Sequence, residues 1–206
     1  WVRSTALGSY REVGRACHLV TTNESKVMID VGVNIASDTD PMPYFTAPEA
    51  LPMEKMDAVI LTHAHLDHAG MLPVLFKYGY RGPVYCTPPT RDMMLLLQTD
   101  YLKVGGAEGK RAPYDMEDIR TCMRHVIDVD WGQTVDIAPD IKLTFHNAGH
   151  ILGSSSVHLH IGEGKHNIVF SGDQKYEKSW LFDAANTRFP RCETLVIEST
   201  YGASGD

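Results

Sequence analysis

The chain has 206 residues, of which 43% are hydrophobic and 22% charged; this composition favours one folded domain with a buried core and excludes a disordered chain. Its formal net charge of -7 excludes a protein that binds nucleic acid through overall positive charge, so any such role must be local. No apolar run approaches the roughly 20 residues that cross a bilayer, and the first residues lack a signal-peptide pattern. We therefore expect a soluble cytoplasmic protein with no membrane partner.

Short apolar runs bounded by turn residues predict strands, and longer stretches with helical spacing predict helices. In chain order, strands are expected at residues 26–31, 57–62, 83–86, 141–145, 156–161, 167–171 and 194–198. Helices are expected at residues 69–78, 90–104 and 114–126, with Asp115 as the N-cap of the third. Gly105, Gly106 and Gly109 predict a flexible connector before it. This order is typical of an α/β protein.

The stretch LTHAHLDHAG, directly after a predicted strand, concentrates potential metal ligands. His63 and His65 are two residues apart in an extended segment, so both imidazoles can face one ion. Asp67 and His68 follow at the expected start of a helix, where they can serve a second ion. Asp67 can also accept a hydrogen bond from an attacking hydroxide. A surface cluster without function is the alternative, but four potential ligands within six residues favour a metal site.

Two later strand ends add to this cluster. His150 follows a glycine in NAGHILG, and Asp173 follows one in FSGD. Each residue alone is a weak indication, but together they supply another imidazole and a carboxylate able to bridge two ions. Two metal ions about 3.5–4 Å apart are suited to hydrolysis of a phosphodiester. Asp30 ends the strand in VMIDVG, and we expect it to hold the ligand loop from behind rather than to bind metal.

The remaining histidines and the cysteines have no pattern that indicates chemistry. His158 and His160 alternate with apolar residues and are expected to face solvent. The cysteines are far apart and form no C-x-x-C pair, so neither disulfides nor a cysteine zinc site is expected. The residues without an expected function are His18, His125, His146, His166, Cys17, Cys86, Cys122 and Cys192.

The order Asp30, then His63-x-His65-x-Asp67-His68, then His150, then Asp173 resembles the first four motifs of the metallo-β-lactamase fold. REVGRACHLV, HAHLDHAGMLP, NAGHILGSSS, FSGD and VIESTYG resemble its β-CASP branch, the RNA-cleaving enzymes related to cleavage and polyadenylation specificity factor, and particularly the archaeal members. The resemblance implies an αββα sandwich. Residues 1–206 are then only the N-terminal part of this domain, up to the β-CASP insertion, because no histidine follows His166 to supply the family's last ligand.

The resemblance also implies an activity: zinc-dependent hydrolysis of RNA in RNA processing and 3′-end formation, leaving 5′-phosphate and 3′-hydroxyl ends. His63, His65 and His150 would hold one Zn²⁺, Asp67, His68 and Asp173 a second, with Asp173 bridging the two. Glu198, in ESTYG, matches the first β-CASP motif and would act in general acid catalysis. The implied partners are single-stranded RNA and, through segments outside these residues, a second copy or a processing complex. The 206 residues alone are expected to be inactive.

Other functions remain open at this point. Another hydrolase of the same fold, such as a thioesterase, a lactonase or a DNA-directed β-CASP nuclease, would use the same ligands. A di-iron protein fits less well, because that branch usually has an acidic residue at the position of His65. A non-catalytic scaffold subunit of an RNA-processing complex is the alternative of another class, and the intact ligand set argues against it.

Overall fold

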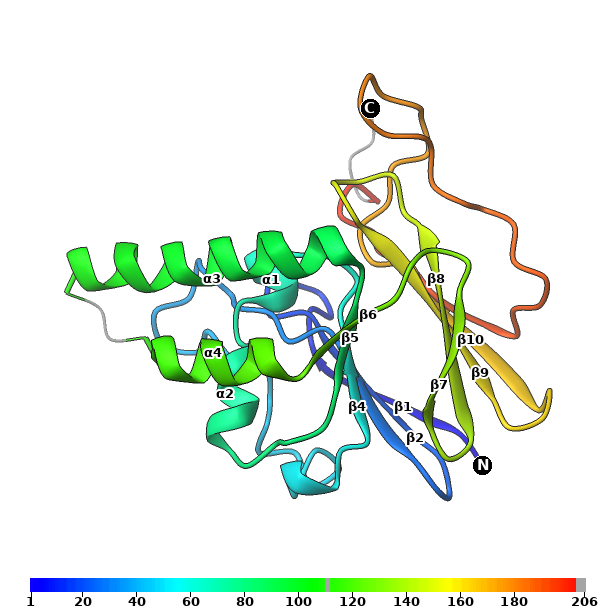
Figure 1. Ribbon diagram of the computed structural model, residues 1–206, viewed down its shortest axis with the longest axis horizontal. Helices are drawn as coiled ribbons and strands as arrows, with labels where there is room; N and C mark the ends of the chain where they lie inside the picture. The colour runs from blue at the N-terminus through cyan, green and yellow to red at the C-terminus, as the bar shows by residue number, and fades with distance from the viewer. Residues whose placement is uncertain (110–111, 203–206) are drawn as a thin grey trace.

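The computed structural model describes residues 1–109 and 112–202, which form two β-sheets packed face to face with helices on the outside of one (Figure 1). The first sheet, sheet A, has the strand order β1-β2-β3-β4-β5-β6. Its strands are β1 (Arg3–Gly8), β2 (Cys17–Thr21), β3 (Lys26–Ile29), β4 (Ala58–Ile60), β5 (Val84–Cys86) and β6 (Val126–Asp128). The pairs from β1 to β3 are antiparallel, and those from β3 to β6 are parallel.

The second sheet, sheet B, has the order β11-β10-β9-β8-β7. Its strands are β7 (Thr134–Ala138), β8 (Ile141–Asn147), β9 (Ser155–Ile161), β10 (His166–Phe170) and β11 (Thr194–Val196). Strands β7 to β10 form an antiparallel meander, whereas β11 returns parallel to β10. Parallel strands need a long connection, and residues 171–193 provide it. That connection contains Asp173.

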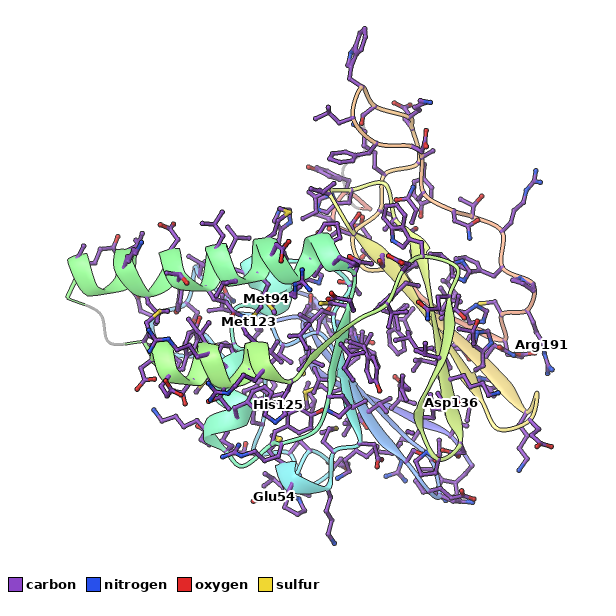
Figure 2. All side chains as sticks on the ribbon, viewed as in Figure 1. Glu54, Met94, Met123, His125, Asp136 and Arg191 are labelled. Atoms are coloured by element: carbon purple, nitrogen blue, oxygen red, sulfur yellow. The ribbon has the colours of Figure 1, made fainter. Side chains whose placement is uncertain are left out.

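The helices cover the outer face of sheet A (Figure 1). They are α1 (Leu66–Ala69), α2 (Leu72–Lys77), α3 (Pro88–Ala107) and α4 (Met116–Arg124), and a 3-10 helix, η1, spans Met53–Lys55. Figure 2 shows Met94 of α3 and Met123 of α4 between these two helices. Asp115 caps α4 as predicted, because its side chain accepts hydrogen bonds from the amides of Glu117 and Asp118. Among the described residues no helix is long and apolar enough to cross a membrane.

Alternation along the strands of sheet A divides the buried side chains into two cores. Leu19, Met28 and Leu61 face the helices, whereas Val20, Ile29 and Ile60 face sheet B. Side chains of β8, β9 and β10 complete the inter-sheet core. Successive strand residues point to opposite faces, so burying both faces of β3 and β4 requires the continuous apolar runs seen in the sequence. The two cores hold the ends of these central strands in fixed positions.

The predicted elements differ from the structure in several places. The helix expected at 69–78 corresponds to α2 (Leu72–Lys77), and the separate short helix α1 (Leu66–Ala69) precedes it. The prediction of a flexible connector at Gly105 and Gly106 was wrong, because α3 continues through both glycines. A β-carbon added at Gly106 would meet nothing within 4 Å, so a side chain at this position would lie in open space. Strands β1, β2, β6 and β7 were not predicted. The described residues contain helices over sheet A only, so three layers of the expected αββα sandwich are present.

The prediction that His158 and His160 face solvent was wrong. His158 is 1% exposed and His160 is half-buried, although both lie on the outer face of sheet B. Residues 183–193, called here the cover segment, lie across this face. The Phe189 ring packs on His146 and His158, and the Asn186 side-chain amide lies 3.0 Å from Nδ1 of His146. Figure 2 shows Arg191, near the end of the cover segment, on the outer side of the sheet.

Candidate metal centre

The predicted ligands lie on loops and in helix α1 at one edge of the two sheets. His63 and His65 lie between β4 and α1, and His65 is the N-cap residue of α1. His150 follows β8, and Asp173 follows β10. Sheet A therefore contributes one half of the cluster and sheet B the other, although 85 positions separate His65 from His150. Packing of one sheet on the other brings the two halves together.

Four side chains form a first group of donor atoms: His63, His65, His150 and Asp173 offer atoms that all lie within 4.8 Å of one another. Nδ1 of His65 is 3.2 Å from Nε2 of His63 and 3.2 Å from Nε2 of His150. Oδ2 of Asp173 is 3.8 Å from Nε2 of His63 and 3.5 Å from Nε2 of His150. Three imidazole nitrogens and a carboxylate oxygen that converge in this way are a donor set suited to a divalent cation.

A second group consists of Asp67, His68 and Asp173. Nε2 of His68 is 3.7 Å from Oδ2 of Asp67 and 3.3 Å from Oδ1 of Asp173. Asp173 therefore directs one carboxylate oxygen to each group. A carboxylate shared in this manner is a suitable bridge between two neighbouring cations.

A buried carboxylate fixes His68 from behind. Asp30 is 2% exposed, and its Oδ2 lies 2.7 Å from Nδ1 of His68. The amide and the hydroxyl of Thr62 both donate to Asp30, each at 2.8 Å. Asp30 has φ of 60°, a left-handed conformation that Asp adopts more readily than most residues. With Nδ1 bound to Asp30, Nε2 of His68 is left free to face Asp67 and Asp173.

The charges of the site favour neutral imidazoles in the first group and a charged pair in the second. Burial, followed by the neighbouring histidines, lowers the pKa of His63 well below its usual value, and burial lowers that of His65. Burial also acts to lower the pKa of His68, but Asp30 and Asp173 outweigh it and raise this pKa. For Asp173, burial opposes ionisation, and the hydrogen bond with His68 more than compensates and lowers its pKa.

The backbone of Asp67 is held by a very close approach. A β-carbon at Gly32 would lie 1.6 Å from the carbonyl oxygen of Asp67, so no larger residue fits at this position. The amide of Ala16 donates to the same carbonyl at 2.8 Å. The segment after β1 and the segment after β3 thus set the position of the second donor group.

A cavity of about 470 Å³ opens beside the second donor group. Asp67, His68 and Asp173 line it, and so does Glu198, two residues after β11. The Glu198 carboxylate accepts hydrogen bonds from the amides of Gln174 and Thr200, both at 3.2 Å. The volume lies within the range of ordinary ligand pockets. Glu198 is therefore close to the same space as the predicted ligands.

Three features of the site were not assigned from the sequence. The Thr62 hydroxyl donates a hydrogen bond to Asp30 and lies 3.0 Å from Nδ1 of His63, so it connects these two residues. His18, expected to have no function, lines the cavity, and burial lowers its pKa to about 4. The loop 9–14, within the stretch GSYREVG, forms part of the wall. Thr62 could have been found from its position directly before HAHLDH, whereas no pattern in the sequence indicated His18.

These features define a class of protein. Residues 19–196 match the family model of the metallo-beta-lactamase superfamily domain, and the chain belongs to this superfamily. Solved structures share its fold: YhfI of Bacillus subtilis aligns with a TM-score of 0.56 at 20% identity, over 86% of this chain and 64% of that one. A protein of unknown function from Enterococcus faecalis aligns with a TM-score of 0.62 at 17% identity, covering 84% of this chain and 43% of that one.

Within that class, similar curated proteins are archaeal. The chain is 59% identical over 202 residues to the transcription termination factor FttA of Methanosarcina mazei. This alignment covers 98% of this chain and 32% of the relative. It is 57% identical over 206 residues to FttA of Methanocaldococcus jannaschii, over 100% of this chain and 32% of the relative. The chain spans about a third of the length of these relatives. The resemblance to archaeal homologues of cleavage and polyadenylation specificity factor is confirmed.

Proposed function

We propose that this chain is the N-terminal part of a zinc-dependent ribonuclease that acts in 3′-end formation and transcription termination. The observation that carries the proposal is the pair of donor groups that share Asp173. The similarity to relatives named as termination factors supports RNA as the substrate. On this proposal the protein acts in the cytoplasm on single-stranded RNA, and regions outside residues 1–206 supply the dimer or complex contacts.

The donor sets fit two zinc ions. His63, His65 and His150 with Asp173 would hold one, and Asp67, His68 and Asp173 the other, since imidazole and carboxylate ligands suit Zn²⁺. Zinc bound there would supply Lewis-acid activation of water and charge stabilisation for the phosphoryl group at neutral pH. Asp30 would keep His68 in the tautomer that presents Nε2 to the second ion.

The remaining roles fall to two carboxylates beside the cavity. Asp67 would accept a hydrogen bond from the attacking water and orient it toward phosphorus. Glu198, on the cavity wall, would donate a proton to the departing oxygen, so that cleavage leaves 5′-phosphate and 3′-hydroxyl ends. Both roles require single-stranded RNA to enter the cavity.

The test uses the full-length protein that carries this chain. Asp67→Ala should abolish cleavage of a labelled single-stranded RNA while the circular dichroism spectrum stays that of the wild type. Wild-type protein should retain about two zinc ions per molecule after dialysis, whereas a scaffold subunit would retain none. Asp136→Ala, an exposed carboxylate on β7, is the matched control and should cleave normally. Retained cleavage by Asp67→Ala would refute the proposed mechanism.

A further inference from the structure

The cavity beside the second donor group has one wall that the proposed reaction does not use. This wall is the loop of residues 9–14, between β1 and β2. Glu198, Ser199, Asp67 and Asp173 also line the cavity. A strand of RNA that reaches the donor groups through this cavity would pass along the loop.

Arg11 differs from the other residues of this wall by its positive charge. Arg11 is the only arginine or lysine among the described residues that line the cavity, which the carboxylates of Asp67, Asp173 and Glu198 also line. Its side chain is exposed, and within residues 1–109 and 112–202 it makes no hydrogen bond or ion pair. Glu12, the acidic neighbour in the loop, is bound to Arg15 instead, at 2.6 Å. The guanidinium of Arg11 is therefore free for a ligand.

The loop is also held in an unusual backbone conformation. Ser9 and Arg11 have φ of 67° and 64°, a left-handed conformation that non-glycine residues seldom adopt. The buried Arg15 fixes the base of the loop: its guanidinium binds Asp40 at 2.6 Å and stacks over the Tyr44 ring at 4.6 Å. The loop is thus held at Arg15 by contacts that do not involve the Arg11 side chain.

From this arrangement we infer that Arg11 binds a backbone phosphate of the RNA as the strand enters the cavity, an inference that rests on the proposed function. A guanidinium has five donors in a planar fork that matches two phosphate oxygens. The carboxylate of Glu198, which belongs to neither donor group, repels a polyanion, and Arg11 offsets this repulsion at the wall. The contact is made to phosphate, so it is independent of base identity.

The salt dependence of RNA binding tests this contact without cleavage. The full-length protein, with Asp67→Ala in every sample, is titrated with a labelled single-stranded RNA at several salt concentrations, and the Kd is measured by fluorescence anisotropy. Arg11→Gln should weaken binding about tenfold and reduce the slope of log Kd against log salt by about 0.7, the value for one phosphate contact on a single strand. Arg11→Lys should keep the slope, because it keeps the charge.

Arg3→Gln is the matched control, since it removes the same charge from an exposed position on β1 that does not line the cavity. It should leave the Kd and the salt slope equal to those of the protein that carries Asp67→Ala alone. If Arg11→Gln has the same Kd and salt slope as the protein with Asp67→Ala alone, the phosphate contact is refuted, even when the protein without Asp67→Ala cleaves RNA. If the protein without Asp67→Ala binds RNA and cleaves none, the proposed function is refuted while the loss of slope in Arg11→Gln still supports the contact.

Discussion

Asp30 connects the candidate metal centre to the core through a single carboxylate. It accepts two hydrogen bonds from Thr62 and lies 2.7 Å from Nδ1 of His68, at 2% exposure. The Thr62 amide, the Thr62 hydroxyl and Nδ1–H of His68 all donate to this carboxylate when Nε2 of His68 faces the donor groups. A residue at this position must therefore offer acceptors on both side-chain oxygens, and Asn offers one acceptor and one donor.

Asp30→Asn should lower the free energy of unfolding by about 3 kcal/mol, because it removes one member of a buried ion pair and turns an amide donor toward other donors. It should also weaken binding at the second zinc position about 10–100-fold. Asn adopts the left-handed conformation as readily as Asp, so backbone strain does not contribute.

Urea denaturation and zinc titration of the full-length protein measure both effects. The control is Asp136→Asn on β7, whose exposed ion pair with Lys142 contributes less than about 1 kcal/mol. Equal zinc affinity in wild type and Asp30→Asn would contradict the role given to Asp30.

Local sequence predicted this centre only in part. His63, His65, Asp67 and His68 are neighbours in the chain, so their grouping could be predicted from spacing alone. The Thr62 hydroxyl and the free guanidinium of Arg11 could not, because their roles depend on contacts or a cavity formed by segments far apart in sequence. The sequence also indicated the distant ligands His150 and Asp173, from their positions at strand ends and from the family resemblance, but it carried no such signal for the roles of Thr62 and Arg11.

At the scale of elements, predictions succeeded at several strands whose two faces are both buried, although β2, which is also buried on both faces, was missed. Strands β3, β4 and β10 have continuous apolar runs and were expected at nearly their observed positions. Edge strands β1, β6 and β7 have exposed polar residues and were missed. Helix α3 extends through Gly105 and Gly106 because an established helix tolerates a local cost of about 1 kcal/mol per glycine.

The outer face of sheet B carries a pH-dependent element. Burial, then the charge of His160, lowers the pKa of His158 from 6.5 to about 4. The unfolded chain thus binds a proton near pH 6.5 that the folded chain excludes down to about pH 4. Because the unfolded state binds more protons in this window, the free energy of unfolding falls as pH decreases from about 7 to 4.

His158→Gln should reduce this loss by at most about 1.4 kcal/mol per pH unit, the value for one proton, because glutamine does not titrate. The residual slope would come from the other buried histidines. Urea denaturation of the chain with chelator present, at pH 7, 6 and 5, measures the difference. If the free energy of unfolding falls with pH equally in wild type and variant, His158 is not the source of the pH dependence.

For the whole molecule, the donor groups join the two sheets. His63, His65, Asp67 and His68 belong to the loop and helix α1 that follow β4 of sheet A, whereas His150 and Asp173 belong to loops of sheet B. The family match confirms the fold that holds these loops, and the described residues contribute both sheets. Neither donor group is complete without Asp173, so both groups form only when the sheets are packed together.

Zinc should therefore stabilise the assembled sandwich as well as serve the proposed reaction. A ligand that binds only the folded state at 100 times its Kd adds about 2.7 kcal/mol to the free energy of unfolding. We expect zinc to raise the unfolding midpoint of the wild type and a chelator to reverse the increase. Asp173→Asn should lose most of this response, because its carboxylate is shared by both donor groups. Asp136→Asn should respond like the wild type. A midpoint insensitive to zinc and chelator in the wild-type protein would show that the donor groups do not link the two sheets through metal.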